Sequence, residues 1–312
     1  MLEIMPNAGD IKFKPKFVEH YSKLTDFDEF RKYSLAFLRK SIRVNTLKIS
    51  IPELKKRLED KWTLTQVPWC KEGFWIAGER RDIGNLAEHV LGYIYVQESA
   101  SMIPPVVLAP REHETVLDMC AAPGSKTTQI AQYMNNTGVV VGNDVEGGRL
   151  KSLKVNVQRM GASNVVVSKT AGRFFKNLEF DRILVDAPCS GIGTIRKSIK
   201  TINMWNLNMV KRIAGTQRQL IQTAFDILKP GGTMVYSTCT LEPIENEGTV
   251  SFLLNKNDNA KLEDIELDIN RSPCVTEFGK DVYHPDVKKC LRIWPQDNNT
   301  EGFFVSKIKK KK

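Results

Sequence analysis

Two cysteines in this chain stand in short turns after apolar stretches, and both are candidates for nucleophilic chemistry. Cys189 lies in DAPCSG (residues 186–191), and Cys239 lies in STCT (residues 237–240). A cysteine thiolate is a strong nucleophile, and groups at the carboxyl ends of neighbouring strands can reach one bound ligand. The pair therefore indicates covalent chemistry on a ring that is first captured and later released.

A third segment has the composition of a loop that binds a nucleotide-type cofactor. Residues 116–127 read VLDMCAAPGSKT, so an apolar strand ends at Asp118 and a turn of small residues leads into a helix. Small residues let a ligand approach the backbone, and a helix start offers free N–H groups. Asp144 ends the next predicted strand, where a carboxylate can accept hydrogen bonds from ribose hydroxyls. The alternative is an ordinary strand–turn–helix corner with a surface aspartate.

Among nucleotide-type cofactors, S-adenosylmethionine fits this loop best. The chain lacks the G-x-G-x-x-G of dinucleotide sites and the G-x-x-x-x-G-K-[ST] of P-loops. S-adenosylmethionine has a ribose and a carboxylate but no phosphate, so it requires neither motif.

These groups suit methylation of a pyrimidine ring at C5. Thiolate attack on C6 makes C5 nucleophilic, and the C5 proton and the thiol must leave afterwards. The scheme needs a nucleophile, a group that polarises the N3/N4 edge, and a release group, which are the types of Cys239, Asp186 and Cys189. Asp186 is expected to stay protonated in a partly apolar pocket and to donate toward N3. Lys126 is expected to lower the pKa of the thiolate or to contact the base.

The other cysteines are expected to be buried core thiols, because free cysteine is usually buried and inert. They are Cys70, Cys120, Cys274 and Cys290, and Cys120 lies inside the cofactor loop, where its backbone can touch the ligand. No Cys-x-x-Cys pair is present, so the sequence predicts no metal site. Free thiols in a chain of this length predict a reducing, cytoplasmic location.

The charge of the chain favours a polyanionic partner. The 312 residues carry a net charge of +10, and nucleic acid is the commonest partner of such proteins. Part of the charge lies in the lysine-rich tail at residues 307–312, which is equally well interpreted as a solvated end. No apolar run approaches the ~20 residues of a membrane span, and no leader pattern opens the chain, so neither a membrane nor secretion is predicted.

The elements that position these groups fall into two parts, predicted as domains at 1–97 and 98–312. The first is a small α+β unit, with helices at 17–24, 27–38 and 52–58 and strands at 42–47, 64–67 and 74–76. The second alternates strands at 115–119, 138–142, 165–167, 182–186 and 233–237 with helices at 125–134, 150–160, 208–228 and 245–254. An antiparallel pair at 291–294 and 302–307 closes it. Continuous apolar strands predict a parallel sheet covered on both faces, with ligands at the strands' carboxyl ends.

With these residues the chain resembles the Sun/Fmu-type RNA cytosine-5 methyltransferases, specifically their compact archaeal or bacterial type that methylates tRNA. The resemblance rests on RVNT (43–46), VQESAS (96–101), DMCAAPGSKT (118–127), DAPCSG (186–191), STCT (237–240), ENE (245–247) and EGFF (301–304). It implies a Rossmann-like S-adenosylmethionine-dependent fold with a mostly parallel seven-stranded sheet and helices on both faces. It also implies a small N-terminal α+β domain that binds RNA.

The resemblance also implies the role of each site residue. Cys239 would be the nucleophile, Cys189 would assist release, and Asp186 and Lys126 would contact the base. The cofactor would lie against Cys120, Ala121, Ala122, Pro123, Gly124, Ser125, Lys126, Asp144, Arg149 and Asp186. One position departs from the family pattern, because Ala171 stands where the family carries an acidic residue near the adenine.

The resulting hypothesis is a monomeric cytoplasmic RNA cytosine-5 methyltransferase, with tRNA as substrate and rRNA as the alternative. A DNA-methylating enzyme would instead use Cys189 as nucleophile and leave Cys239 dispensable, so the presence of both thiols favours RNA. A non-catalytic RNA-binding or assembly factor is the remaining alternative, and the intact Cys239, Cys189, Asp186 and Lys126 argue against it.

Basic residues of the first part are predicted to form one RNA groove with the basic side of the second part. They are Arg31, Lys32, Arg39, Lys40, Arg43, Lys55, Lys56 and Arg57. Cations that neutralise phosphates make binding weaken steeply with salt. For residues 55–57 the alternative is a solvated helix face.

Overall fold

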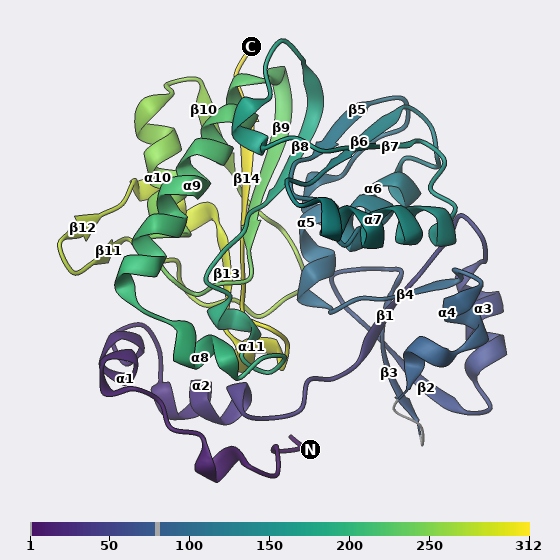
Figure 1. Cartoon of the computed structure of the whole chain (residues 1–312), viewed down its shortest axis with the longest axis horizontal. Coiled ribbons are helices and arrows are strands. Elements are labelled where there is room, and N and C mark those ends of the chain that lie inside the picture. The colour runs from purple at the N-terminus through teal and green to yellow at the C-terminus, as the bar shows by residue number, and fades with distance from the viewer. Residues whose placement is uncertain (1, 79–81) are drawn as a thin grey trace.

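The strands after residue 115 form one mixed sheet whose centre is parallel (Figure 1). The structure is a computed structural model that describes residues 2–78 and 82–312, so residues 1 and 79–81 of the predicted small domain lie outside the described part. The strand order is β10-β14-β9-β8-β5-β6-β7, with β13 paired to β14. Its strands are β5 (Thr115–Asp118), β6 (Val139–Asn143), β7 (Val165–Ser168), β8 (Phe180–Asp186), β9 (Leu228–Thr238), β10 (Ala260–Glu263), β13 (Leu291–Ile293) and β14 (Phe303–Lys310).

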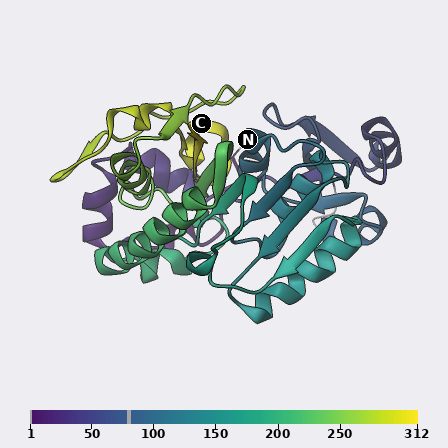
Figure 2. The same cartoon turned by 90° about the horizontal axis from the view of Figure 1, so that it is seen from above.

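The five strands from β9 to β7 are parallel, and β14 runs antiparallel to β9. The prediction of a mostly parallel sheet of seven strands is therefore confirmed. The predicted closing pair is also present, because β13 and β14 pair antiparallel with Leu291 opposite Val305. The sheet is twisted, as the chirality of L-residues favours, and Figure 2 shows this twist from above.

Alternate residues of the central strands enter two different hydrophobic clusters. Leu117, Ile183 and Met234 pack in one cluster with residues of α9 and α10. Their sequence neighbours Val116, Leu184 and Val235 pack in the other, with residues of α5 and α6. Because side chains alternate along a strand, this pattern means that helices cover both faces of the sheet. The helices are α5 (Ile103–Leu108), α6 (Ser125–Tyr133), α7 (Gly147–Met160), α8 (Lys200–Met204), α9 (Leu207–Asp226), α10 (Glu247–Lys256) and α11 (Pro295–Asn298).

A second, antiparallel sheet lies in the N-terminal part of the chain. Its order is β2-β3-β1-β4, with β1 (Ser41–Val44), β2 (Trp62–Gln66), β3 (Gly73–Gly78) and β4 (Ile94–Val96). Helices α3 (Ile51–Leu58) and α4 (Ala87–Val90) belong to the same unit. Ser50 and Glu53 form a capping box at the start of α3, with Pro52 in the first turn as predicted. The prediction of a small N-terminal α+β unit is confirmed, and the structure adds that its sheet is antiparallel.

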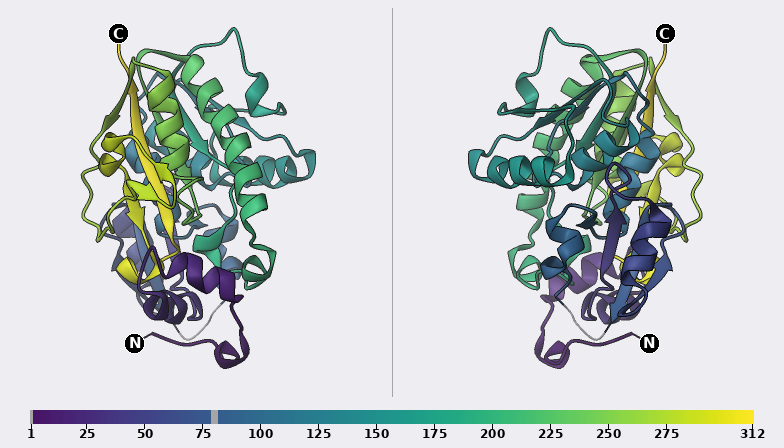
Figure 3. Two further views of the ribbon diagram at one scale, coloured as in Figure 1. Left: turned by 90° about the vertical axis from the view of Figure 1, so that its left-hand side faces the viewer. Right: turned by 90° about the vertical axis from the view of Figure 1, so that its right-hand side faces the viewer.

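The first two helices pack on the larger sheet domain rather than on the small sheet (Figures 1 and 3). They are α1 (Pro15–Tyr21) and α2 (Phe27–Ser34). Phe17, Tyr21 and Phe30 lie in one buried aromatic cluster with Trp205 and Trp294. The N-terminal segment up to Ser34 therefore packs on the larger domain, and the small sheet begins only at Ser41.

The largest errors in the predicted boundaries are the end of one helix and the start of one strand. The helix predicted at 27–38 ends at Ser34, because Ala36 bridges to Ile4 as a short strand would. The strand predicted to begin at residue 233 begins at Leu228, which pairs with Phe180 before a register shift. In both cases the boundary is set by pairing with a residue far away in the sequence, and local composition does not reveal such pairing.

The remaining elements are short. They are the hairpin of β11 (Glu277–Phe278) and β12 (Asp281–Val282), and the 3₁₀ turns at Ala8–Asp10, Ile83–Asn85, Ala100–Met102, Gly172–Phe174, Ile192–Thr194 and Pro285–Lys289. Across residues 2–78 and 82–312, none of the helices combines the length and the apolar character that crossing a membrane requires.

Candidate active site

The carboxyl ends of the central parallel strands bring the predicted groups to one edge of the sheet. Asp118 ends β5, Asp186 ends β8 and Thr238 ends β9. Asp186 pairs in register with Ser237, so the turns that follow these two residues start side by side. We name these turns the Cys189 turn (residues 187–191) and the Cys239 turn (residues 238–241).

The two cysteines meet across these turns. The sulfur atoms of Cys189 and Cys239 lie 3.3 Å apart, and both thiols are free and half-buried. The hydrogen bond between the thiols, together with burial, raises the pKa of Cys189 well above its ordinary value. Cys189 is thereby kept as a neutral thiol, which can donate its S–H to the sulfur of Cys239.

The Cys239 turn also fits closely against a loop that follows the Cys189 turn. Gly193 donates its N–H to the carbonyl of Cys239 at 3.0 Å, and Gly302 donates to the carbonyl of Gly193. A Cβ atom at Gly193 would lie 2.1 Å from the carbonyl oxygen of Gly302, so only glycine allows this approach. The backbone at the nucleophile candidate is therefore held by direct main-chain contacts.

Lys126 and Asp186 form an ion pair beside the thiols. Lys126 Nζ lies 2.7 Å from Asp186 Oδ2, and the hydroxyl of Ser237 donates to Oδ1 at 2.8 Å. Burial opposes the charge of Lys126, but the Asp186 carboxylate outweighs it, so the pKa of Lys126 is raised. Both oxygens of Asp186 accept bonds here, whereas the sequence predicted an acid that donates toward the base. The ammonium of Lys126 is the charged donor that this structure pairs with Asp186.

A cavity of about 480 Å³ opens in front of these groups, within the size range of small-molecule sites. Of the residues predicted to bind the cofactor, the lining includes Cys120, Ala122, Asp144, Arg149 and Asp186, together with Cys189 and Cys239. The other predicted residues do not line it: Ala121, Pro123, Gly124, Ser125 and Lys126. Two of these residues anchor the loop through their backbone. The carbonyl of Pro123 accepts a hydrogen bond from the side chain of Asn156, and the carbonyl of Ser125 accepts one from Arg43.

Asp144 is positioned as a ribose-binding carboxylate would be. It follows β6, its side chain is buried, and its oxygens accept from the N–H groups of Ala122 and Glu146. Arg149 lies 3.3 Å from it and is half exposed, so its guanidinium can turn toward an anionic ligand. Carboxylates, an adaptable arginine and apolar walls fit the ribose, the carboxylate and the adenine of S-adenosylmethionine.

Two other walls complete this cavity. One is the loop after β7, at Thr170, Gly172 and Arg173, which the sequence placed near the adenine through Ala171. The other is a face of α9 at Thr216, Gln219 and Leu220, which sequence reasoning missed. The side chain of Asn143 fixes the loop, since it bonds both the N–H and the carbonyl of Thr170. Ala171 also lines the cavity, so this wall offers backbone atoms at the position where an acidic side chain was expected. The local sequence signal for the wall on α9 is the spacing of residues 216, 219 and 220, which places them on one face of a helix.

The structure divides the predicted RNA-binding cations into buried, half-buried and exposed residues. Arg43 is fully buried and donates to Gln97, Gln132, Thr128 and the carbonyl of Ser125, so its predicted contact with RNA is wrong. It joins β1 to α6 instead. Half-buried Arg39 donates to the carbonyl of Asn298. The exposed cations are Arg31, Lys32, Lys40, Lys55, Lys56 and Arg57.

The other thiols differ in burial. Cys70 and Cys290 are buried, as predicted, and burial raises the pKa of Cys70 to about 11. Cys274 is only half-buried, and Cys120 is half-buried at the cavity wall. Within the described part of the chain, no group of three or more His, Cys, Asp or Glu side chains is arranged to hold a metal ion.

Two family models match the chain. That of 16S rRNA methyltransferase RsmB/F matches residues 105–309, and that of the N-terminal domain of 16S rRNA methyltransferase RsmF matches residues 13–99. The first match covers most of the larger domain, including both cysteine turns and the cofactor loop.

Individual relatives extend over nearly the whole chain. A tRNA (cytosine(49)-C(5))-methyltransferase from Pyrococcus abyssi is 48% identical over 96% of this chain and 97% of that protein. Ribosomal RNA small subunit methyltransferase F from Shewanella oneidensis is 42% identical over 96% of this chain, which spans only 64% of that protein. The crystal structure of NSun6 from Pyrococcus horikoshii with SFG, an S-adenosylmethionine analogue, has a TM-score of 0.85 at 26% identity. That alignment covers 97% of this chain and 99% of the other.

Proposed function

This chain belongs to the RsmB/F family of RNA methyltransferases, and we propose that its substrate is transfer RNA. Family membership makes it an S-adenosylmethionine-dependent RNA cytosine-5 methyltransferase. The proposal concerns which RNA and which cytosine it modifies, and which residues carry the reaction. We propose the cytosine at position 49 of tRNA as the target.

The observation that carries this choice is the degree of identity to the two kinds of relative. The Pyrococcus abyssi tRNA enzyme is 48% identical over 96% of this chain, whereas the Shewanella oneidensis rRNA enzyme is 42% identical over the same share. The greater identity to the tRNA enzyme supports tRNA as the substrate.

In the proposed reaction Cys239 attacks C6 of the target cytosine. Its sulfur forms a bond to C6, and electron density moves to C5 and the N3 edge of the ring. Lys126, paired with Asp186 beside the thiols, stabilises the negative charge that passes from Cys239 to the base. Asp144, Cys120 and Ala122, which line the cavity, would hold S-adenosylmethionine, and that cofactor would supply the electrophilic methyl group for C5.

Release then requires loss of the C5 proton and cleavage of the bond between C6 and the Cys239 sulfur. A base in the site, which water can serve as, takes the C5 proton. The electron pair of the C5–H bond then restores the ring double bond, and the sulfur leaves as a thiolate. Cys189 is a neutral thiol 3.3 Å from that sulfur, so its S–H can stabilise the departing thiolate by a hydrogen bond. This accounts for two cysteines with different roles in one site.

The arrangement of the chain completes the proposal. Residues 98–312 would carry the reaction, and residues 1–97 would hold the RNA through exposed cations such as Lys55 and Lys56. A cytosine inside a helix must leave its stack before a thiol can reach C6. We propose that one copy of the chain suffices and that it works in the cytoplasm.

The test uses purified protein with S-adenosylmethionine and two substrates, a full tRNA transcript and a 16S rRNA transcript. Bisulfite sequencing should show 5-methylcytosine at position 49 of the tRNA and none in a transcript with uridine there. Methylation confined to the 16S transcript would favour the ribosomal alternative. Absence of methylation in both, together with RNA binding, would favour a non-catalytic RNA-binding factor.

A further inference from the structure

The residues that follow the two cysteines are hydrogen-bonded to each other. The hydroxyls of Ser190 and Thr240 lie 2.7 Å apart, and both side chains are buried. Each belongs to a turn outside any helix or strand, where the backbone has no regular partners. This bond therefore ties the Cys189 turn directly to the Cys239 turn.

Glu245 holds the Cys189 turn from the other side. Its Oε2 accepts from the N–H of Ser190 at 3.0 Å and from the amide of Gln217 at 2.9 Å. The same amide donates to the carbonyl of Pro188 at 2.9 Å, so the peptide groups on both sides of Cys189 are anchored. Glu245 is itself fixed, since its carbonyl accepts from the hydroxyl of Tyr236.

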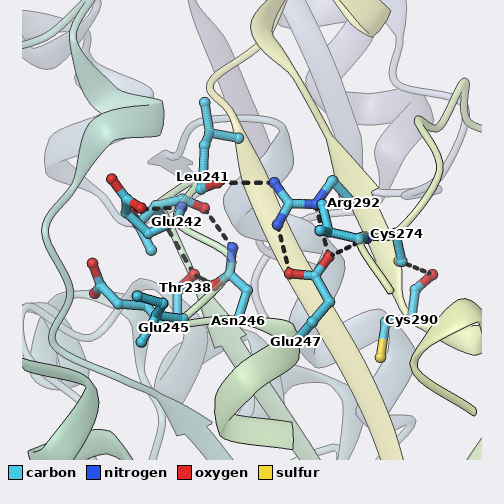
Figure 4. A network of polar contacts seen from close by, with 12 residues as sticks. Thr238, Leu241, Glu242, Glu245, Asn246, Glu247, Cys274, Cys290 and Arg292 are labelled. Atoms are coloured by element: carbon cyan, nitrogen blue, oxygen red, sulfur yellow. Dashed lines mark hydrogen bonds and ion pairs between the residues drawn. The ribbon is translucent and has the colours of Figure 1, made fainter. Parts of the chain in front are cut away.

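The neighbouring residue holds the other turn. Asn246 accepts from the hydroxyl of Thr238 at 2.6 Å and donates to the carbonyl of Thr240 at 3.1 Å. Figure 4 shows Asn246 beside Thr238, on the segment between Glu242 and Glu247. Consecutive residues of one rigid segment thus hold the two cysteine turns, one each, and the Cys239 turn keeps its own anchor when the Cys189 turn is loosened.

The other two carboxylates of this segment serve different parts of the molecule. Glu242 accepts from the hydroxyl of Tyr21 and the indole of Trp205, and Glu247 pairs with Arg292 (Figure 4). All three carboxylates are fully buried. Of these three carboxylates, Glu245 is the one that is hydrogen-bonded to the Cys189 turn among the described residues.

We propose that Glu245 and the Ser190–Thr240 hydrogen bond are positioning groups that set Cys189 against Cys239 for the release step. The inference rests on the proposed function, in which Cys239 attacks and Cys189 assists release. A displacement of ~1 Å at a reacting group can lower a rate about 100-fold. Loosening the Cys189 turn should therefore slow release while attack and methyl transfer, which depend on Cys239 and Lys126, continue.

The experiment follows the covalent protein–RNA adduct in Glu245→Ala and Ser190→Ala. Each variant is incubated with tRNA and S-adenosylmethionine and run on a denaturing gel, beside single-turnover methyl transfer. Both should accumulate about 10- to 100-fold more adduct than the wild type, with first-turnover methylation retained and multiple turnover lost. Glu245→Gln and Ser190→Thr keep the acceptor or hydroxyl and should restore release.

Glu242→Gln is the matched control, because Glu242 is as buried as Glu245 and lies on the same segment without touching the Cys189 turn. It should lower the melting temperature without trapping RNA. Loss of first-turnover methylation in Glu245→Ala and Ser190→Ala, with no more adduct than in Glu242→Gln, would show a purely structural role and overturn the inference.

Cys189→Ala, tested in parallel, distinguishes a failure of the proposed function from a failure of the positioning role of Glu245 and Ser190. If it traps RNA while Glu245→Ala and Ser190→Ala release it normally, the proposed function stands and this inference fails. If Cys189→Ala traps no RNA, the release role of Cys189 is wrong and the inference falls with it.

Discussion

The sulfur of Cys189 lies 3.3 Å from the sulfur of Cys239, although the two residues are 50 positions apart in the chain. The contact follows from the pairing of β8 with β9, which sets Asp186 opposite Ser237 and lets both turns begin at one edge. Two thiolates at this distance would repel each other, so a single negative charge is favoured. The hydrogen bond to Cys239, together with burial, raises the pKa of Cys189 and keeps Cys189 as a neutral thiol.

This asymmetry predicts opposite outcomes for the two alanine variants. Cys239→Ala should lose methylation and form no covalent adduct, because no sulfur can attack C6. Cys189→Ala should attack and methylate but fail to release, so a protein–RNA adduct should survive denaturing electrophoresis. A DNA-type mechanism would reverse the order, with an adduct in Cys239→Ala and none in Cys189→Ala. A purely structural role would leave both variants merely less stable, with activity returning on cooling.

Asp144 should contribute to cofactor binding alone. Replacing it with alanine removes a charged hydrogen-bond acceptor worth about 1.5–3 kcal/mol, which corresponds to a roughly 10- to 150-fold rise in the dissociation constant for S-adenosylmethionine. Calorimetry measures this rise, and a filter-binding assay should give the wild-type RNA affinity. Unchanged cofactor affinity would contradict the assignment of the cavity.

Exposed and buried cations of the small domain should respond differently to substitution. Lys55→Ala and Lys56→Ala should each flatten the dependence of log affinity for RNA on log salt by about 0.7–0.9 if the residue contacts a phosphate. Arg43→Met should instead destabilise the fold, by about 1–3 kcal/mol for each buried acceptor left without its donor. Urea unfolding and salt titrations distinguish the two effects. A lysine variant with the wild-type salt slope would place the RNA elsewhere.

Asp118 should make the stability of the protein decline toward alkaline pH. Burial raises its pKa from 3.8 to about 7, and one carboxylate oxygen lacks a hydrogen-bond partner. The folded state therefore holds this proton more tightly than the unfolded state. Its stabilising contribution is complete below pH 3.8 and is lost as the pH rises through about 7.

Asp118→Asn removes that titration while it preserves an acceptor for the hydroxyl of Thr127. Between pH 5 and pH 8, the free energy of unfolding of the variant should rise relative to that of the wild type by about a few kcal/mol, which is the order that a pKa shift of this size implies. Urea unfolding at both pH values gives the difference, since the other groups titrate equally in the two proteins. A difference that does not change with pH would contradict the prediction.

Much of this architecture was predictable because it is encoded locally. Apolar strands with turn residues after them, such as the one ending at Asp118, mark a parallel sheet and the edge where ligands bind. The capping box of Ser50 and Glu53 likewise starts α3 where Pro52 indicated. Such signals act over a few residues, so a single sequence displays them.

Other features could not be predicted, because they depend on residues that the chain brings together from afar. The burial of Arg43 required acceptors on α6, and nothing in its own surroundings distinguished it from the exposed lysines of α3. The packing of α1 on the larger domain depends on Glu242, 221 residues beyond Tyr21. The cavity wall at Thr170 depends on the side chain of Asn143.

The sequence by itself therefore determined the inventory of the site: two thiols, a lysine, two carboxylates and a loop of small residues, in or near the segments that follow the predicted strands. The tertiary structure decided how these groups pair. It set Lys126 against Asp186, Cys189 against Cys239, and Ser190 against Thr240. The reason is that residue type and local periodicity specify elements, whereas strand order and register specify which element ends meet. Hydrogen bonds and pKa values act over a few ångströms, so they are settled only when those ends have come together.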